Sequence, residues 1–109
     1  LKKGGLLVFY TPNIESVGFE LMKSKQNLIQ PFFHLNFFSK NVLNYMCKKI
    51  GYKILKFETF GLDLVDFFFM KESHDKFLYT KKLKKEISII QSIIDQKGCA
   101  NHMRVTLKK

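Results

Sequence analysis

The chain has 109 residues, enough for one domain or part of one, and its 46% hydrophobic and 26% charged residues exclude an intrinsically disordered protein. Nineteen basic and nine acidic residues give a formal net charge of +10, which is compatible with an anionic partner. The basic residues are all Lys except Arg104, whereas specific readers of nucleic acids usually rely on Arg. A Lys-rich nucleic-acid binder is therefore kept only as an alternative.

Two cysteines, Cys47 and Cys99, have no Cys or His partners at the spacings of metal sites. Free thiols are typical of a reducing compartment, so we expect a cytoplasmic protein. There is no signal peptide, and the apolar runs are shorter than the ~18 residues of a membrane span, so we expect no such span. Because the chain begins at Leu1 rather than at a methionine, we also expect an N-terminal portion to be missing.

Five apolar residues, Leu6 to Tyr10, lie between a pair of glycines and the turn Thr11-Pro12-Asn13. An unbroken apolar run with Val, Phe and Tyr predicts a strand that is buried on both faces in a parallel sheet. Proline cannot donate to a neighbouring strand, so the strand should end by Thr11. Open α/β sheets bind ligands at the carboxyl ends of their strands, so Thr11 or Asn13 could contact a ligand; an ordinary turn is the alternative.

One short helix is predicted near the start of the chain and one long helix near its end. Asn13 is a candidate N-cap for a short helix over residues 14–23. Residues 77–96 carry a continuous apolar stripe and are followed by Gly98, which predicts one long helix that ends before this glycine.

The clearest helix in the sequence is expected over residues 40–50, with Ser39 as its N-cap and Gly51 in the left-handed conformation after it. Residues 52–60 predict a strand with one partly polar face, which should place it near an edge of the sheet. Residues 102–108 alternate strictly between apolar and polar side chains and predict a final strand.

The segment 31–39 is unusual because four Phe and one Leu surround His34 and Asn36. Neither helical nor strand periodicity fits it, so we expect a structured loop that packs its aromatic side chains. A His and an Asn held among aromatic rings could face a ligand. The alternative is a structural His whose ring nitrogens bond the backbone.

Two acidic residues, Asp63 and Asp66, interrupt the apolar stretch 62–70. They could be a general acid–base pair or metal ligands, but no third ligand lies at a recognisable spacing, so no metal site is predicted. Asp63 could simply cap a turn. The run Phe67 to Phe69 could be a strand end, a helical turn or part of a partner surface.

Four stretches together carry a resemblance to a known family: residues 1–13 (Leu-Lys-x-Gly-Gly to Thr-Pro-Asn), 34–39 (His-x-x-Phe-Phe-Ser), 50–52 and 90–105. They resemble the C-terminal half of class I S-adenosylmethionine-dependent methyltransferases, and in particular the family called methyltransferase domain 23. The first two motifs at this spacing are more specific than either motif alone. The resemblance covers almost the whole chain.

The resemblance implies an α/β fold that is part of a Rossmann-like, seven-stranded sheet. Residues 1–109 would be the C-terminal portion of one methyltransferase domain and supply strands five to seven with their flanking helices. The last strand would be antiparallel and inserted between strands five and six. The cofactor S-adenosylmethionine would bind mainly to an N-terminal half that this chain lacks, because the sequence has no Gly-rich cofactor turn. We therefore expect the fragment alone to be inactive.

The resemblance also implies which residues form the substrate side of the site. The expected substrate-pocket residues belong to its two motifs, namely Thr11, Pro12, Asn13, Asn36 and Phe38. His34 is the candidate catalytic residue, since a neutral imidazole can take a proton from a hydroxyl or an amine. Positioning of the two reactants alone could also suffice.

The expected function is thus methyl transfer to a small-molecule or glycan-type acceptor by the complete protein. The expected partners are that acceptor and the chain's own N-terminal half. A non-catalytic interaction module, which pairs through an exposed strand edge and the cluster Phe67 to Phe69, is the alternative; a homodimer would be one form of it.

Overall fold

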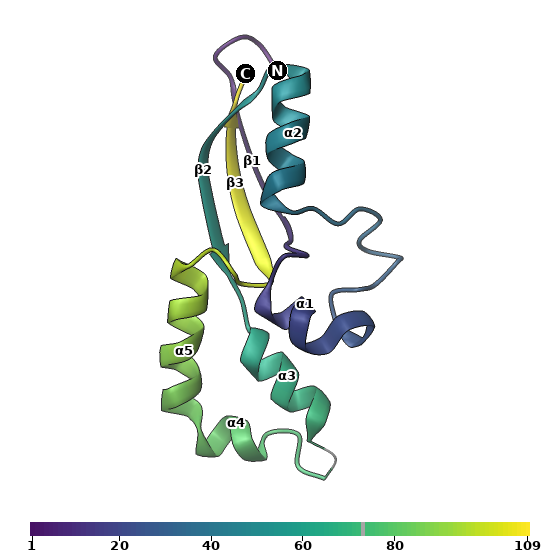
Figure 1. Ribbon diagram of the computed structural model, residues 1–109, viewed down its shortest axis with the longest axis vertical. Coiled ribbons are helices and arrows are strands. Elements are labelled where there is room, and N and C mark those ends of the chain that lie inside the picture. Colours follow the sequence, from purple (N-terminus) through teal and green to yellow (C-terminus); the bar gives the residue numbers. More distant parts are fainter. Residues whose placement is uncertain (73) are drawn as a thin grey trace.

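The structure, a computed structural model, describes residues 1–72 and 74–109 and has an α/β fold (Figure 1). Three strands, β1 (Leu6–Pro12), β2 (Lys53–Phe60) and β3 (His102–Lys108), form a sheet in the order β1-β3-β2. β3 is antiparallel to both neighbours, so β1 and β2 run in the same direction. The prediction that the last strand lies antiparallel between the other two is confirmed.

Helix α2 (Lys40–Ile50) has the predicted bounds and the predicted caps at both ends. The Oγ atom of Ser39 accepts a hydrogen bond from the backbone N–H of Val42 at 3.2 Å. Gly51 follows the helix with φ 74°, a left-handed conformation that a residue with a Cβ atom adopts only with strain.

We expect Ser39→Ala to lower the free energy of unfolding by about 1 kcal/mol, because it leaves an N–H group at the start of α2 without its acceptor. Urea unfolding measures the change. Ser24→Ala is the control, since Ser24 is exposed in the short 3-10 helix η1 (Lys23–Lys25) and caps no α-helix. Equal losses in the two variants would contradict the capping role.

The core lies between the sheet and α2. Met103, Val105 and Leu107 of β3 are buried, and the residues between them are partly exposed, which confirms the alternation predicted for the last strand. These three side chains pack with Leu43 and Cys47 of α2. The thiol of Cys47 is buried and unpaired, and the burial raises its pKa.

β2 lies at an edge of the sheet in the described part of the chain, as predicted. Its side chains do not alternate strictly between the two faces of the sheet, because the pairing with β3 shifts between Ile54 and Lys56. Ile54 and Phe57 consequently both pack on the core, although strict alternation would place them on opposite faces.

β1 differs from its prediction in pairing, in burial and in its last residue, which is Pro12 rather than Thr11. It pairs with β3 in antiparallel fashion, and Leu6, Val8 and Tyr10 are 59%, 52% and 60% exposed. The prediction of a strand buried on both faces in a parallel sheet is therefore wrong. The physical reason is that α2 covers only one face of this three-stranded sheet, and no described element covers the other face or the outer edge of β1 (Figure 1).

Helix α1 (Val17–Met22) begins later than predicted, and Ser16 rather than Asn13 is its N-cap. The Oγ atom of Ser16 accepts from the N–H of Phe19 at 3.2 Å. The side chain of Asn13 bonds to neighbouring loops instead, so the Asn13 cap prediction is wrong.

The segment 31–39 is a loop, as predicted, and its regular pairing is a single bridge between Phe38 and Asn13. Its aromatic packing is only partial. Phe32 and Phe33 are 96% and 77% exposed, since no described residue covers them. Phe37 does pack, with its ring edge-on to Phe19 at 6.1 Å.

The undecided stretch 62–70 is mostly helical and belongs to α3 (Asp63–Lys71). The predicted long helix is broken at Leu83 into α4 (Leu78–Lys82) and α5 (Lys84–Gln96). Like charges three and four residues apart disfavour a continuous helix at this point. The lysines concerned are Lys81, Lys82, Lys84 and Lys85. The break also lets α4 turn back onto α3, where the N–H of Tyr79 donates to Glu72 at 2.7 Å.

The molecule is elongated, with extents of 53 × 29 × 18 Å and a radius of gyration of 15.9 Å. A compact domain of this length has a radius of about 13 Å. The sheet and α2 form one end, and α1, α3, α4 and α5 gather at the other (Figure 1). None of the helices in the described residues is long and apolar enough to cross a membrane.

Candidate functional site

The carboxyl ends of β1 and β2 and the start of β3 meet at one end of the sheet. Pro12 at the end of β1 and Phe60 at the end of β2 both lie opposite His102, the first residue of β3. Helices α1 and α3 begin just beyond this end (Figure 1). In open α/β sheets such a place, outside the carboxyl ends of strands, is where ligands bind.

Asn13 fixes the chain as it leaves β1. It is 1% exposed, its N–H donates to the carbonyl of Asn101 at 2.8 Å, and its Nδ2 donates to the carbonyl of Ala100 at 3.0 Å. Its Oδ1 accepts from the N–H of Glu15 at 3.2 Å. Asn13 thus joins the end of β1 to the loop before β3.

The residues expected to form the substrate pocket lie in two places. Pro12 and Asn13 are buried at the end of β1, and Phe38 is held beside them because its carbonyl accepts from the N–H of Ile14 at 3.1 Å. Thr11 precedes them on β1 and pairs with Met103 on β3, whereas Asn36 is exposed on the loop 31–39.

His34, the candidate catalytic residue, is partly buried in the same loop. The centre of its ring lies 6.4 Å from that of Phe37. Its backbone N–H donates to the carbonyl of Gln30, and no hydrogen bond to its ring nitrogens is found among the residues that the structure describes. It is near enough to the end of the sheet for its charge to affect the pKa of His102.

Asp63 is the centre of the hydrogen bonding at this end. It is 0% exposed and accepts from the N–H of Gly18 at 2.7 Å, from the N–H of Asn101 at 3.2 Å and from Nε2 of Gln91 at 2.9 Å. One carboxylate thereby ties α3 to α1, to β3 and to α5. It does not cap a turn, since the N-cap of α3 is Leu62.

Two glycines allow this close packing. A Cβ atom at Gly18 would lie 2.8 Å from Oδ1 of Asp63, and one at Gly61 would lie 2.1 Å from Oδ1 of Asn101. Any side chain at these positions would displace the carboxylate or the amide.

A second row of polar side chains runs from α3 to β3. The Nδ2 of Asn101 donates to Oδ2 of Asp66 at 3.2 Å, and the Oδ1 of Asn101 lies 2.9 Å from Nδ1 of His102. Asn101 is 0% exposed, while Asp66 and His102 are partly buried. In the row Asp66–Asn101–His102 the buried amide of Asn101 therefore links two side chains that are each partly exposed.

Burial shifts the pKa values at both ends of this row. Loss of solvation raises the pKa of Asp66, and the charge of Asp63 raises it further. Hydrogen bonds from Asn27 and Asn101 act in the opposite direction and lower this pKa. Loss of solvation also lowers the pKa of His102 below 6.5, opposed by Asp66 and Asp63 and assisted by the charge of His34. The lowered pKa favours the neutral imidazole form of His102.

A cavity of about 420 Å³ opens beside this row of side chains. Its lining residues come from the loop after η1, from the end of β2 and the junction that follows it, and from helices α3 and α5 and the start of β3. They are Asn27, Leu28, Phe60, Gly61, Leu62, Asp66, Asp95 and His102.

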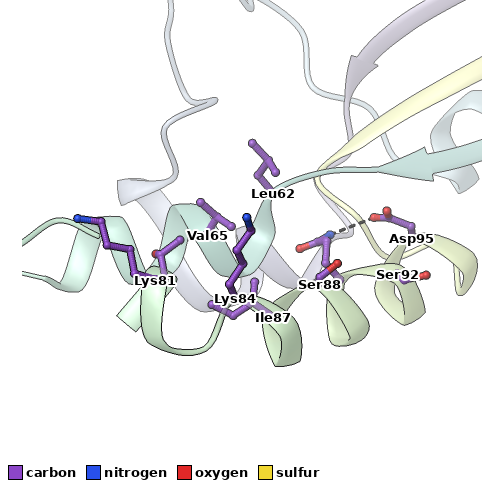
Figure 2. Close-up of a pocket in the computed structure, with 10 residues that line it drawn as sticks. Leu62, Val65, Lys81, Lys84, Ile87, Ser88, Ser92 and Asp95 are labelled. Atoms are coloured by element: carbon purple, nitrogen blue, oxygen red, sulfur yellow. Dashed lines mark hydrogen bonds between the residues drawn. The ribbon is translucent and has the colours of Figure 1, made fainter. Parts of the chain in front are cut away.

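A second, larger cavity of about 490 Å³ lies between α3 and the α4–α5 stretch (Figure 2). It shares Leu62 and Asp95 with the first cavity, and Gln91 donates to Asp95 at 3.0 Å in its wall. Lysines Lys81 and Lys84 belong to its lining. Its lining includes one acid, Asp95, and no His, whereas the smaller cavity is lined by His102 and two acids, so we place the candidate site at the smaller cavity.

The described residues include no group of three or more His, Cys, Asp or Glu side chains that could hold a metal ion. They also do not fit S-adenosylmethionine: the residues around the 420 Å³ cavity include one glycine, Gly61, which Asn101 already contacts closely. No Gly-rich turn of the cofactor-binding kind is formed by residues 1–72 or 74–109.

Sequence reasoning found one acidic pair, Asp63 and Asp66, but did not connect it with Asn101 and His102. One signal in the sequence could have made this connection. Asn101 and His102 are polar residues at the start of the alternating strand β3, and this start lies at the end of the sheet where β1 and β2 stop. The roles of the two acids differ, since Asp63 is structural and Asp66 faces the cavity.

No family model, no curated protein and no solved structure matches this chain.

Proposed function

We propose that this chain is the C-terminal part of an S-adenosylmethionine-dependent methyltransferase domain. In the complete protein it supplies the substrate side of a site that transfers a methyl group to a small-molecule or glycan-type acceptor. The cofactor binds mainly to the N-terminal half, so the 109-residue chain alone is inactive.

The observation that carries the proposal is the order of the strands. The resemblance implies a final strand that enters antiparallel between two strands of one direction, and the sheet has the order β1-β3-β2 with β3 antiparallel to both. Antiparallel strands in largely parallel sheets are commonly found at an edge rather than inside, so this order is a selective feature.

A second observation agrees with it. The outer edge of β1 has no partner among the described residues, and Leu6, Val8 and Tyr10 are more than half exposed beside it. A free edge with apolar side chains is the kind of surface that another part of the same domain covers. The proposed occupant is the N-terminal half.

The test is a calorimetric titration of the full-length protein with S-adenosylmethionine, together with transfer of a labelled methyl group. We expect the full-length protein to bind the cofactor, and the 109-residue chain, titrated as the control, to give no heat of binding. A full-length protein that contains a Gly-rich cofactor turn and still binds no S-adenosylmethionine contradicts the proposal.

The free edge of β1 also supports a second candidate, an interaction module that pairs with a second copy of the chain. The net charge of +10 on each copy makes the two copies repel each other, and salt would screen this repulsion. Size-exclusion chromatography with light scattering, at low and high salt, measures the mass. A monomer in both conditions rules this candidate out.

A further inference from the structure

The charges around the 420 Å³ cavity are opposite to those of the chain as a whole. None of the 19 basic side chains lines it, although the chain carries a net charge of +10. Two carboxylates, Asp66 and Asp95, do line it, and Leu28, Phe60 and Leu62 complete its wall. Such a lining favours a cation with a small apolar part over an anion.

Asn101 determines which nitrogen of His102 carries the proton. An ionised Asp66 can only accept, so the amide of Asn101 must turn its Nδ2 toward Asp66 and its Oδ1 toward His102. Oδ1 is an acceptor, and Nδ1 of His102 must therefore donate to it. In a neutral imidazole this leaves the lone pair on Nε2.

The ring of His102 is also held in a fixed plane. Phe60 stacks on it with a centroid distance of 5.8 Å and an interplanar angle of 13°, and Tyr10 packs edge-on against Phe60. Within the described part of the chain no hydrogen bond reaches Nε2. His102 lines the cavity, so a free lone pair on a fixed ring is available to a ligand there.

We propose that this cavity binds a small molecule with an ammonium group and that Nε2 of His102 accepts a proton from it. Asp66 and Asp95 attract the ammonium, and Asn101 and Asp66 position the imidazole. The inference rests on the proposed function for the fate of the resulting amine, which would be the methyl acceptor; binding and proton transfer do not depend on it.

The proton transfer balances without any other reactant. One N–H bond of the ammonium breaks, its electron pair stays on the nitrogen, and the proton forms a new bond to Nε2. The products are a neutral amine with a free lone pair and an imidazolium, whose positive charge Asp66 and Asp63 partly compensate. A neutral amine is the form that acts as a nucleophile.

This assignment gives His102, rather than His34, the proton-accepting role. Both are partly buried, but His34 does not line the cavity, and its described contact is with the ring of Phe37. The charge of a protonated His34 lowers the pKa of His102 through space. The third histidine, His74, lies in an exposed segment and serves as an internal reference.

The first experiment measures the tautomer of His102 by long-range ¹H–¹⁵N NMR at neutral pH, with no ligand. We expect a protonated Nδ1 and an unprotonated Nε2 at His102, and the usual mixture with mainly protonated Nε2 at His74. A protonated Nε2 at His102 overturns the proposal.

Asp66→Asn separates positioning from packing, because the two side chains have the same shape. The new amide can donate to Oδ1 of Asn101, which allows Asn101 to turn its Nδ2 toward His102. We expect the proton of His102 to move to Nε2 in this variant. If Asp66 were purely structural, the substitution would leave the tautomer of His102 unchanged. An unchanged tautomer would therefore overturn the positioning role given to Asp66.

The second experiment titrates the protein with ethanolamine, with sodium acetate as the matched anionic probe. We expect saturable NMR shifts at Leu28, Leu62 and His102 with ethanolamine and none with acetate. Binding should weaken by about tenfold in Asp66→Asn, which removes one charge next to the ligand. It should also weaken as the pH falls through the lowered pKa of His102 and the imidazole becomes protonated.

Shifts with acetate, or shifts confined to the larger cavity around Ser88, overturn the proposed ligand class, as does the absence of saturable shifts with ethanolamine. These readouts need no cofactor. If ethanolamine does not bind but the full-length protein binds S-adenosylmethionine, the inference alone is rejected. If ethanolamine binds but the full-length protein does not bind S-adenosylmethionine, the proposed function alone is rejected.

Discussion

Asp63→Ala is expected to lower the free energy of unfolding by about 3–5 kcal/mol. The substitution leaves two buried donors, the N–H groups of Gly18 and Asn101, without an acceptor. It also removes one of the two acceptors of Nε2 of Gln91, which keeps only its bond to Asp95. Each unsatisfied buried donor costs about 1–3 kcal/mol. Urea unfolding, followed by circular dichroism, measures the loss.

Asp75→Ala is the matched control for this prediction. Asp75 is exposed, and its Oδ1 accepts one hydrogen bond, from the N–H of Phe77 at 2.9 Å. We expect a loss of about 0.5–1 kcal/mol. Similar losses at positions 63 and 75 would show that Asp63 does not hold the four elements together.

The second large effect is expected for Met103→Ala, which should cost about 2–5 kcal/mol. Met103 is 0% exposed in the middle strand, so its removal leaves a cavity between β3 and the core side chains of α2. The cavity cannot close easily, because strands on both sides hold the backbone of β3 in place. Thermal unfolding of the purified protein measures the decrease.

Met46→Ala tests whether burial is the cause. Met46 is 42% exposed on α2, so we expect its loss to cost less than about 1 kcal/mol. If the two methionine variants were equally destabilised, the position of Met103 in the core would not explain its effect.

The elements with local signals could be predicted from the sequence. Ser39 and Gly51 mark both ends of α2, and the alternation of residues 102–108 defines β3 and its buried face. In these segments capping, periodicity and tertiary packing favour the same structure. The α/β class followed from the order of the predicted helices and strands, and the antiparallel last strand was implied by the resemblance alone.

The departures arise where packing decides between local alternatives. The apolar run of β1 has the composition of a buried strand, yet Tyr10 is 60% exposed because no described element covers it. Asn13 and Ser16 are both good N-caps, and the bonds of Asn13 to Ala100 and Asn101 determine that Ser16 is used. Nothing in residues 13–16 alone could decide this.

The candidate site was only partly predictable for a similar reason. Thr-Pro-Asn at the end of β1 was singled out by its position after an apolar strand. The row from Asp66 to His102 depends on a contact between residues 35 positions apart in the chain. No local pattern specifies such a contact, and it appears only when β3 lies between β1 and β2.

The central position of β3 also bears on how the chain folds. Leu6 pairs with Lys108, and Lys53 pairs with the same residue. Among the described residues β1 and β2 therefore have no strand partner other than β3, which is the last of the three strands to be synthesised. Pairings between residues this distant close large loops and form slowly. During synthesis both incomplete strand edges are open to aggregation, and we expect the nascent chain to need a chaperone until β3 is made.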